Sequence, residues 1–341
     1  MKDLQALKDL ALHAAKGTMP ADAPAEFTIS DVNADLRTEL NALACDYNAY
    51  RRNKLDIFEI IQEVADEVVP NKVIAAMGQF AEIKQVAHGV RASFKQKVGK
   101  ARAKQFITRV GLAGVYETFR LDKSTFDIEP KAFGGAAYID FERFIAGDED
   151  ISDYMDIIVE GIADKVFEEV QAALQASVSA IRPANTVVSN TYDADSLFAL
   201  CNVVRAYGSG AVIFASPEFV ASMGADAIIA AGTYYAPTAS PSDIESIHNT
   251  GYVTIFRGTP IVRLPQSFTD ETNATKVISP DYAYIFPTGG EKVVKIVLEG
   301  DTIVDEYTNR DKSMEIQAYK KFGVGIATYY NWAVYYNASL S

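Results

Sequence analysis

The stretch MEIQAYKKFGVGIATYYNWAVYYN, residues 314–337, places an apolar side chain at almost every second position. Ten of the twelve even-numbered positions from Met314 to Tyr336 are apolar or aromatic, and the exceptions are Lys320 and Thr328. A period of two indicates an extended strand with one buried face. At about 3.3 Å per residue the stretch would span roughly 75 Å, far beyond the usual strand of about 5–6 residues.

Residues 151–181 predict a long amphipathic helix. Their large apolar side chains follow one stripe with a mean spacing of 3.75 residues. A rod of roughly 45 Å follows from a rise of about 1.5 Å per residue, and Pro183 is expected to end it. Most of the acidic residues fall outside the stripe and are expected to face outward; among them are Asp153, Asp156, Glu160, Asp164 and Glu168.

The other segments complete an α+β pattern. Residues 1–76 read as helices, with LDIFEIIQEVADEVVP expected to stop at Pro70, and residues 76–139 read as strands. Residues 184–290 predict a compact α/β unit with a hairpin turn at Arg257-Gly258-Thr259. Its other short elements are expected to be DADSLFALCNVVRAYG, AVIFA, SPEFVASMG and SPSDIESIHNTG. A second hairpin is expected in residues 293–308, around Glu299-Gly300-Asp301.

Composition limits the class of protein. The chain has 341 residues, enough for two or three compact units, with 49% hydrophobic and 23% charged residues, as in a soluble folded protein. No apolar run approaches the ~18 residues of a membrane span. Cys45 and Cys201 have no metal or redox spacing, so we expect reduced thiols in the cytosol. The N-terminus reads as an amphipathic helix and not as a secretion signal.

Charge is distributed in two opposite blocks. The formal net charge of −13 argues against a protein that grips nucleic acid by its net charge. Residues 83–116, the basic segment, contain eight Lys or Arg and no Asp or Glu. Residues 140–169 contain eleven acidic residues against Arg143 and Lys165, a local charge of −9. The basic segment admits three interpretations: a nucleic-acid surface, a solvated flexible loop, or a surface that docks on the acidic helix of the same chain or of a copy.

The sequence offers no catalytic constellation. His13, His88 and His248 share no motif, and HExxH, GxGxxG, P-loop and GxSxG patterns are missing from the sequence. The pairs Asp193/Asp195 and Asp305/Glu306 read as helix caps and solvated faces. We therefore predict no enzyme, no cofactor and no metal site.

The order of these segments resembles that of a known family. The chain has, in order, a helical N-terminal part, a long basic β excursion and an acidic long helix. A compact α/β insert follows, and the chain returns through strands rich in Gly and aromatic residues. This is similar to the major capsid proteins of tailed bacteriophages, which have the Hong Kong 97-type capsid fold that encapsulins share. The resemblance covers nearly the whole chain and lies in element order; its segments are VYETFRLDKSTFDIEP, the helix from Ile151, AVIFASPEFVASM, FRGTPIVRLP and YTNRDKSMEIQAYKKFGVGIATYYNWAVYYN.

The resemblance implies a division of the chain. Residues 1–75 would be a helical N-terminal arm, 76–135 an extended basic β loop, and 136–183 the peripheral domain with its long spine helix. Residues 184–290 would be the axial domain, and 291–341 the returning strands that complete the peripheral sheet. Because Gly323 and Gly325 permit a bend, the opening stretch can leave one sheet and enter another, with its apolar face covered by the spine helix.

The resemblance also implies function. Many copies would assemble into hexamers and pentamers of an icosahedral shell, a late structural protein of the virion, put together in the host cytoplasm around the viral genome. Implied partners are the portal, scaffolding or decoration proteins, and double-stranded DNA through weak contacts on the inner surface; none is a membrane. The family's extended loop lies across a neighbouring subunit. We carry that interface role over to Lys95, Lys97, Lys100, Arg102 and Lys104, facing Asp153, Asp156, Glu160 and Asp164.

Two alternatives to a phage capsid stay open. An encapsulin-type shell, which encloses an enzyme cargo, has the same fold. A nucleic-acid-binding protein would use residues 83–116, although Phe94 and Phe106 are the only aromatic side chains placed among their basic residues.

Overall fold

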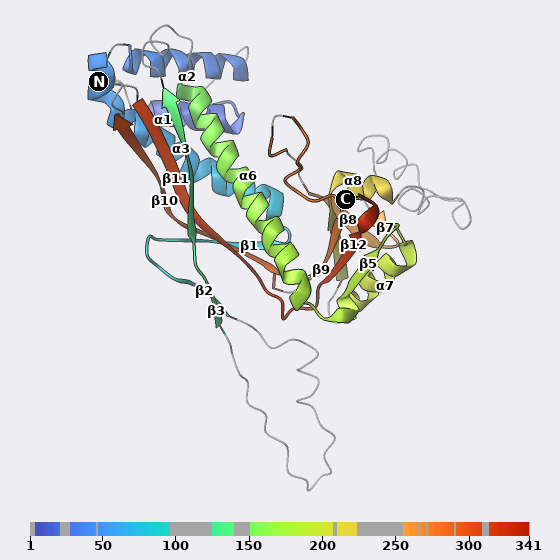
Figure 1. Cartoon of the computed structure of the whole chain (residues 1–341). Helices are drawn as coiled ribbons and strands as arrows, with labels where there is room; N and C mark the ends of the chain where they lie inside the picture. The colour runs from blue at the N-terminus through green and yellow to red at the C-terminus, as the bar shows by residue number, and fades with distance from the viewer. Residues whose placement is uncertain are drawn as a thin grey trace.

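The computed structural model describes residues 4–20, 28–45, 47–95, 125–139, 151–206, 210–223, 255–264, 266, 268–270, 272–289, 291–308 and 314–340. Within them the chain forms two sheets and a short ribbon, together with long helices along one sheet and short helices beside the other (Figure 1). The four-stranded sheet has the order β1-β10-β11-β4, and the six-stranded sheet has the order β5-β12-β9-β6-β8-β7. Strands β2 and β3 pair as a separate ribbon. The α+β class predicted from the sequence is confirmed.

Three helices precede the first strand: α1 (Leu4–Lys16), α2 (Ile29–Leu43) and α3 (Tyr47–Met77). The predicted stop at Pro70 is wrong, because α3 continues through this proline to Met77. Pro70 removes one helical hydrogen bond, and a proline inside a helix costs about 3 kcal/mol. Val68, Val69 and Val73 around it are fully buried in the main core. Burial of such side chains, at about 1.5–3 kcal/mol each, outweighs that cost.

The four-stranded sheet contains β1 (Ala81–Val86), β4 (Lys131–Ile139), β10 (Val294–Thr308) and β11 (Met314–Ile326). The predicted hairpin at 299–301 is wrong, because β10 is one strand that pairs with β11 on both sides of an irregularity between Glu299 and Ile303. Gly300 lies there with a φ of 64°. The Asp66 carboxylate accepts bonds from Thr302 N (2.8 Å) and Oγ1 (2.7 Å). This carboxylate therefore stabilises a bulge where the sequence suggests a turn.

The six-stranded sheet contains β5 (Thr186–Ser189), β6 (Gly210–Ala215), β7 (Ile255–Phe256), β8 (Thr259–Arg263), β9 (Tyr282–Thr288) and β12 (Ala333–Asn337). Helix α7 (Ala194–Arg205) packs on it, and α8 (Pro217–Ser222) begins after its N-cap Ser216, within the predicted element SPEFVASMG. The β7–β8 hairpin is confirmed, with φ of 42° at Arg257 and 77° at Gly258. The predicted helix SPSDIESIHNTG lies outside the described residues.

The opening stretch passes from one sheet to the other, as predicted. Strand β11 lies in the four-stranded sheet, and β12 pairs with β5 and β9 in the six-stranded sheet. The change of sheet occurs at 327–332 and not at Gly323 or Gly325, which are within β11. The division that assigned all of 291–341 to the peripheral sheet is therefore wrong for β12.

Two asparagines hold this crossing. Asn185 Nδ2 donates to the carbonyl of Trp332 (2.7 Å) and to Asn331 Oδ1 (2.8 Å). Asn331 Nδ2 donates to the carbonyl of Val203 (2.8 Å). Asn185 is the last residue of the second 3₁₀ turn after the long helix, so these bonds connect both passages of the chain between the two sheets.

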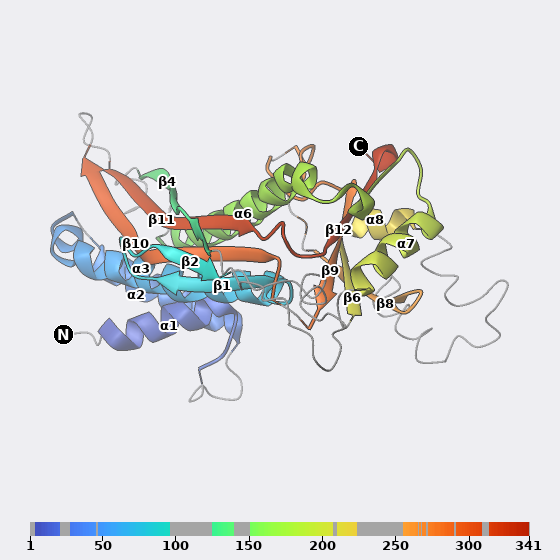
Figure 2. The same ribbon diagram turned by 90° about the horizontal axis from the view of Figure 1, so that it is seen from below.

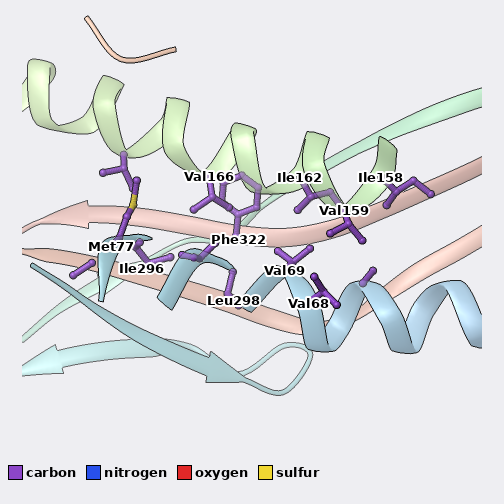
Figure 3. Packing of buried hydrophobic residues seen from close by; sticks show 14 of the residues in the cluster. Val68, Val69, Met77, Ile158, Val159, Ile162, Val166, Ile296, Leu298 and Phe322 are labelled. Atoms are coloured by element: carbon purple, nitrogen blue, oxygen red, sulfur yellow. The ribbon is translucent and has the colours of Figure 1, made fainter. Parts of the chain in front are cut away.

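The main core lies between the helices and one face of the four-stranded sheet. Helix α6 (Ile151–Ser177) and 3₁₀ turns at 178–180 and 183–185 occupy the predicted helical region. Its predicted stripe is buried at Ile158, Ile162, Val166, Val170 and Leu174. Figure 3 shows Val166 beside Phe322 of β11, with Val68 and Val69 of α3 close to Val159. The apolar face of β11 is thus covered by the spine helix, as expected.

Candidate functional site

The two faces of the four-stranded sheet carry different structures. Even-numbered residues of β11, such as Ile316 and Phe322, are buried with the helices in the main core. Odd-numbered Gly323 and Gly325 face the opposite way, toward Ile128 of β3. The β2–β3 ribbon (Ala92–Lys95 and Thr125–Ile128) therefore packs on the face that α3 and α6 leave uncovered.

The β2–β3 ribbon has a small apolar core of its own. Ala92, Phe94 and Ile128 are buried with Val297 of β10, and the ring of Phe94 stacks on that of Phe126 at 5.6 Å. Added Cβ atoms at Gly323 and Gly325 would lie 2.8 Å and 2.7 Å from Ile128, closer than real contacts allow. These glycines consequently make room for the ribbon, a role that the sequence pattern did not indicate.

Two lysines flank the buried ring of Phe94. Lys84 Nζ is 4.0 Å from its centroid and Lys295 Nζ is 5.5 Å away. Lys295 is 1% exposed and forms an ion pair with Glu82, a neighbour on β1. Cations over an aromatic face attract the ring quadrupole, so charged side chains of β1 and β10 add to the forces that fix the ribbon.

The loop between β1 and β2 is held on the bulge of β10. The amide of Gly89 donates to Glu299 Oε1 at 2.9 Å, and His88 Nδ1 lies 3.9 Å from the same oxygen. The His88 ring covers Gly300, where an added Cβ would lie 2.3–2.5 Å from ring atoms. Lys321 Nζ also lies 3.9 Å from Glu299. The loop that leads from β1 into the β2–β3 ribbon is thus held in place by contacts within one subunit.

We define the acidic face of α6 as Asp153, Asp156, Glu160 and Asp164. Asp156 and Glu160 are exposed and Asp164 is half-buried, whereas the side chain of Asp153 lies outside the described part. Lys72 Nζ of α3 is 3.9 Å from Glu160 Oε1. The outward placement predicted for Asp156 and Glu160 is confirmed.

The predicted basic partners are described only in part. Lys95 is exposed at the end of β2. Lys97, Lys100, Arg102 and Lys104 lie outside the described residues. Because the β2–β3 ribbon and α6 are on opposite faces of the four-stranded sheet, the structure does not bring Lys95 toward the acidic face of its own subunit (Figure 2).

The acidic residues and the cysteine that could take part in chemistry have structural roles or are buried. Asp193 is the N-cap of α7 as predicted, but Glu306 pairs with Lys54 (3.1 Å) and its side chain is only 10% exposed, so it is not solvated. Burial raises the pKa of the Cys201 thiol, which disfavours the reactive thiolate. Within the described ranges no group of three His, Cys, Asp or Glu could hold a metal, and no helix is long and apolar enough to span a membrane.

Comparison with solved structures gives the fold. The capsid of cyanophage P-SCSP1u is similar with a TM-score of 0.52 and 11% identity, covering 76% of this chain and 87% of the other. The mature capsid of bacteriophage PhiM1 has a TM-score of 0.50 and 11% identity, over 77% and 87%. The head of Helicobacter pylori bacteriophage KHP40 has a TM-score of 0.50 and 10% identity, over 76% and 88%. These likenesses are to Hong Kong 97-type capsid folds, as the sequence resemblance implied.

Sequence comparison gives the family. No curated protein is similar enough in sequence to match. The family model described as "SPbeta prophage-derived putative capsid protein YonB" matches residues 7–335, which is almost the whole chain. The chain belongs to this YonB family of prophage-derived capsid proteins and has the Hong Kong 97-type capsid fold.

Proposed function

We propose that the chain is the major subunit of an icosahedral shell, built from hexamers and pentamers, that encloses a phage genome in the virion. The fold and family support the shell. The observation that carries the mode of assembly is the placement of the β2–β3 ribbon and the acidic face on opposite faces of one sheet. A contact between these surfaces of two copies joins unlike patches, and such head-to-tail contacts form closed rings when the rotation from one copy to the next closes.

The proposed contact pairs the basic segment of one copy with the acidic face of the next. The contact would consist of ion pairs between two sets of side chains. The basic set is Lys95, Lys97, Lys100, Arg102 and Lys104, and the acidic set is Asp153, Asp156, Glu160 and Asp164. Opposite fields of this size steer association and set orientation, and their effect declines with salt because exposed charges are screened. The buried packing around Phe94 fixes the end of β2 at Lys95, where the rest of the basic segment begins. A fixed starting point lowers the loss of conformational entropy when that segment docks.

The domain division is proposed with the correction for β12. Residues 1–75 form the N-terminal arm and 76–135 the extended loop, although β1 already belongs to the sheet. Residues 136–183 and the strands within 291–326 form the peripheral domain, and 184–290 with β12 form the axial domain. Portal, scaffolding or decoration proteins and weak inner contacts with double-stranded DNA complete the proposed set of partners, with assembly in the host cytoplasm.

Assembly is tested on purified protein by sedimentation velocity and electron microscopy. We expect uniform shells from the unmodified chain, and folded, unassembled subunits after reversal of Lys97, Lys100 and Lys104 to Glu. Reversal of Lys2, Lys131 and Arg182 to Glu, three cations outside the basic segment, is the control that changes the net charge by the same amount. Normal shells from the triple variant would refute the pairing. Particles without nucleic-acid absorbance that contain an enzyme would favour the encapsulin alternative, whereas salt-dependent DNA binding by lone subunits would favour the nucleic-acid-binding one.

A further inference from the structure

A small cavity lies where α6 meets the six-stranded sheet. Its volume is about 10 Å³. Helix α6 contributes Phe167, Val170 and Leu174 to its wall, and strands β6 and β9 contribute Phe214 and Phe286. These side chains belong to the main core or pack against it. Protein interiors are close-packed and contain few voids as large as a water molecule, so a cavity at this position calls for an occupant.

Two polar side chains complete an otherwise apolar wall. They are Gln171 of α6, which is 6% exposed, and Tyr284 of β9, which is 1% exposed. Gln171 Nε2 and the Tyr284 hydroxyl are buried and have no hydrogen-bond partner among the described residues. Because buried polar groups of native proteins are nearly always hydrogen-bonded, these two atoms indicate a ligand with hydrogen-bonding capacity between them.

We propose that the cavity binds one structural water molecule, which joins α6 to the six-stranded sheet by accepting hydrogen bonds from Gln171 Nε2 and the Tyr284 hydroxyl. A cavity of roughly 10–15 Å³ holds a single water, and two polar partners suffice to keep it there. Burial raises the pKa of the Tyr284 hydroxyl, so this group keeps its proton and acts as a donor. The water site does not depend on the proposed function, because it belongs to the folded subunit.

A direct bond between the two side chains would satisfy them less well. Gln171 is close enough to Tyr284 to lower the pKa of its hydroxyl, against the larger effect of burial. Whichever atom of the Gln171 amide faced the hydroxyl, one of the two donors, N–H or O–H, would keep no acceptor inside the apolar wall. A water oxygen accepts both protons and therefore satisfies both donors at once.

Gln171 also gives the water a route to solvent. The same side chain lines a wider surface groove of about 580 Å³ between α6 and residues 274–280. Gln175 and Lys276 lie on the wall of this groove. A rotation of the Gln171 side chain would let water pass from the groove to the cavity without separating the core side chains. The site can therefore fill and exchange in the folded subunit.

The site is observed directly in a density map of the purified protein, from crystals or from assembled particles, at a resolution that shows ordered water. The map should contain a solvent peak at about 2.7–3.2 Å from Gln171 Nε2 and at a similar distance from the Tyr284 hydroxyl oxygen. A closed or empty cavity in that map would overturn the proposal.

Gln171→Leu and Tyr284→Phe test the bridge in solution by urea unfolding. Each variant alone takes away one partner of the water and should raise the unfolding equilibrium constant about three- to tenfold. The double variant makes the whole wall apolar, so it should be more stable than either single variant. Gln175→Leu and Tyr282→Phe are the matched controls, on the same helix and strand but outside the cavity wall, and their effects should add.

Two outcomes of the unfolding experiment would overturn the bridge. A double variant less stable than both single variants would show that the two side chains act independently. Coupled variants combined with a map that lacks the solvent peak would show that the amide and the hydroxyl bond directly, without a water between them.

Discussion

Gly325→Ala is predicted to destabilise the unassembled subunit, because its added methyl group meets the β2–β3 ribbon. The added Cβ would lie 2.7 Å from Ile128 Cδ1, 2.9 Å from Ile128 Cγ1 and 3.2 Å from the ring of Phe126. Overpacking a buried site costs about 1–3 kcal/mol. Relief of the glycine entropy cost returns about 0.5–1 kcal/mol. The net expectation is a loss of up to about 2.5 kcal/mol in the free energy of unfolding.

The sign should reverse when Ile128 is truncated. In an Ile128→Ala background the two closest atoms are gone and the Phe126 ring, at 3.2 Å, has space to move, so Gly325→Ala should stabilise the subunit by up to about 0.5–1 kcal/mol, the entropic contribution. Urea unfolding of unassembled protein measures both arms of this cycle. Gly135→Ala is the matched control in β4, because its added Cβ meets no described atom within 4 Å. An equal effect of Gly325→Ala in both backgrounds would refute the packing of the ribbon against β11.

Two further substitutions and one change of pH test contacts elsewhere in the subunit. Lys320→Met should cost about 3–5 kcal/mol in urea unfolding, because Lys320 is 3% exposed and pairs with the half-buried Asp66; a change below about 1 kcal/mol would contradict that pairing. Asn185→Ala should lower the free energy of unfolding by about 1–3 kcal/mol, since it leaves the buried carbonyl of Trp332 without its donor. An unchanged free energy of unfolding would show that Asn185 does not stabilise the passage of the chain between the two sheets. Hydrogen bonds from Ala274 N and from the side chains of Thr272 and Thr275 lower the pKa of Asp270 to about 2, so the order of its loop should persist above pH about 4 and be lost as the pH falls toward 2. Amide hydrogen exchange of the loop residues measures this order as a function of pH. Equal protection of the loop at pH about 4 and at pH about 2 would contradict the role of the Asp270 carboxylate.

The sequence predicted those elements that are governed by hydrophobic period. The stripe of α6 and the buried face of β11 follow directly from spacings of 3.75 and two, because burial on one side imposes the period. The change of sheet in residues 314–337 was also predictable, since the stretch is several times longer than the usual strand of about 5–6 residues.

Errors arose where tertiary contacts override local preference. Pro70 does not end α3, because its neighbours are buried in the main core. Gly300 does not make a hairpin, because Asp66, distant in sequence, bonds to Thr302 and supports a bulge. Gly323 and Gly325 permit a bend on sequence alone, but in the structure they accommodate the side chain of Ile128. Each error involves a partner far away in the chain, which a local pattern cannot contain.

The central claim, that unlike charged surfaces of two copies meet head to tail, is tested most directly by a charge swap within one chain. One variant carries Lys97, Lys100 and Lys104 as Glu, a second carries Asp156, Glu160 and Asp164 as Lys, and a third carries all six changes. Electron microscopy and sedimentation should find no shells with either set alone and shells again with both, because the swapped surfaces attract once more. Shells from a variant with only one set of three changes would contradict the claim. So would a variant with all six changes that stays folded but does not assemble.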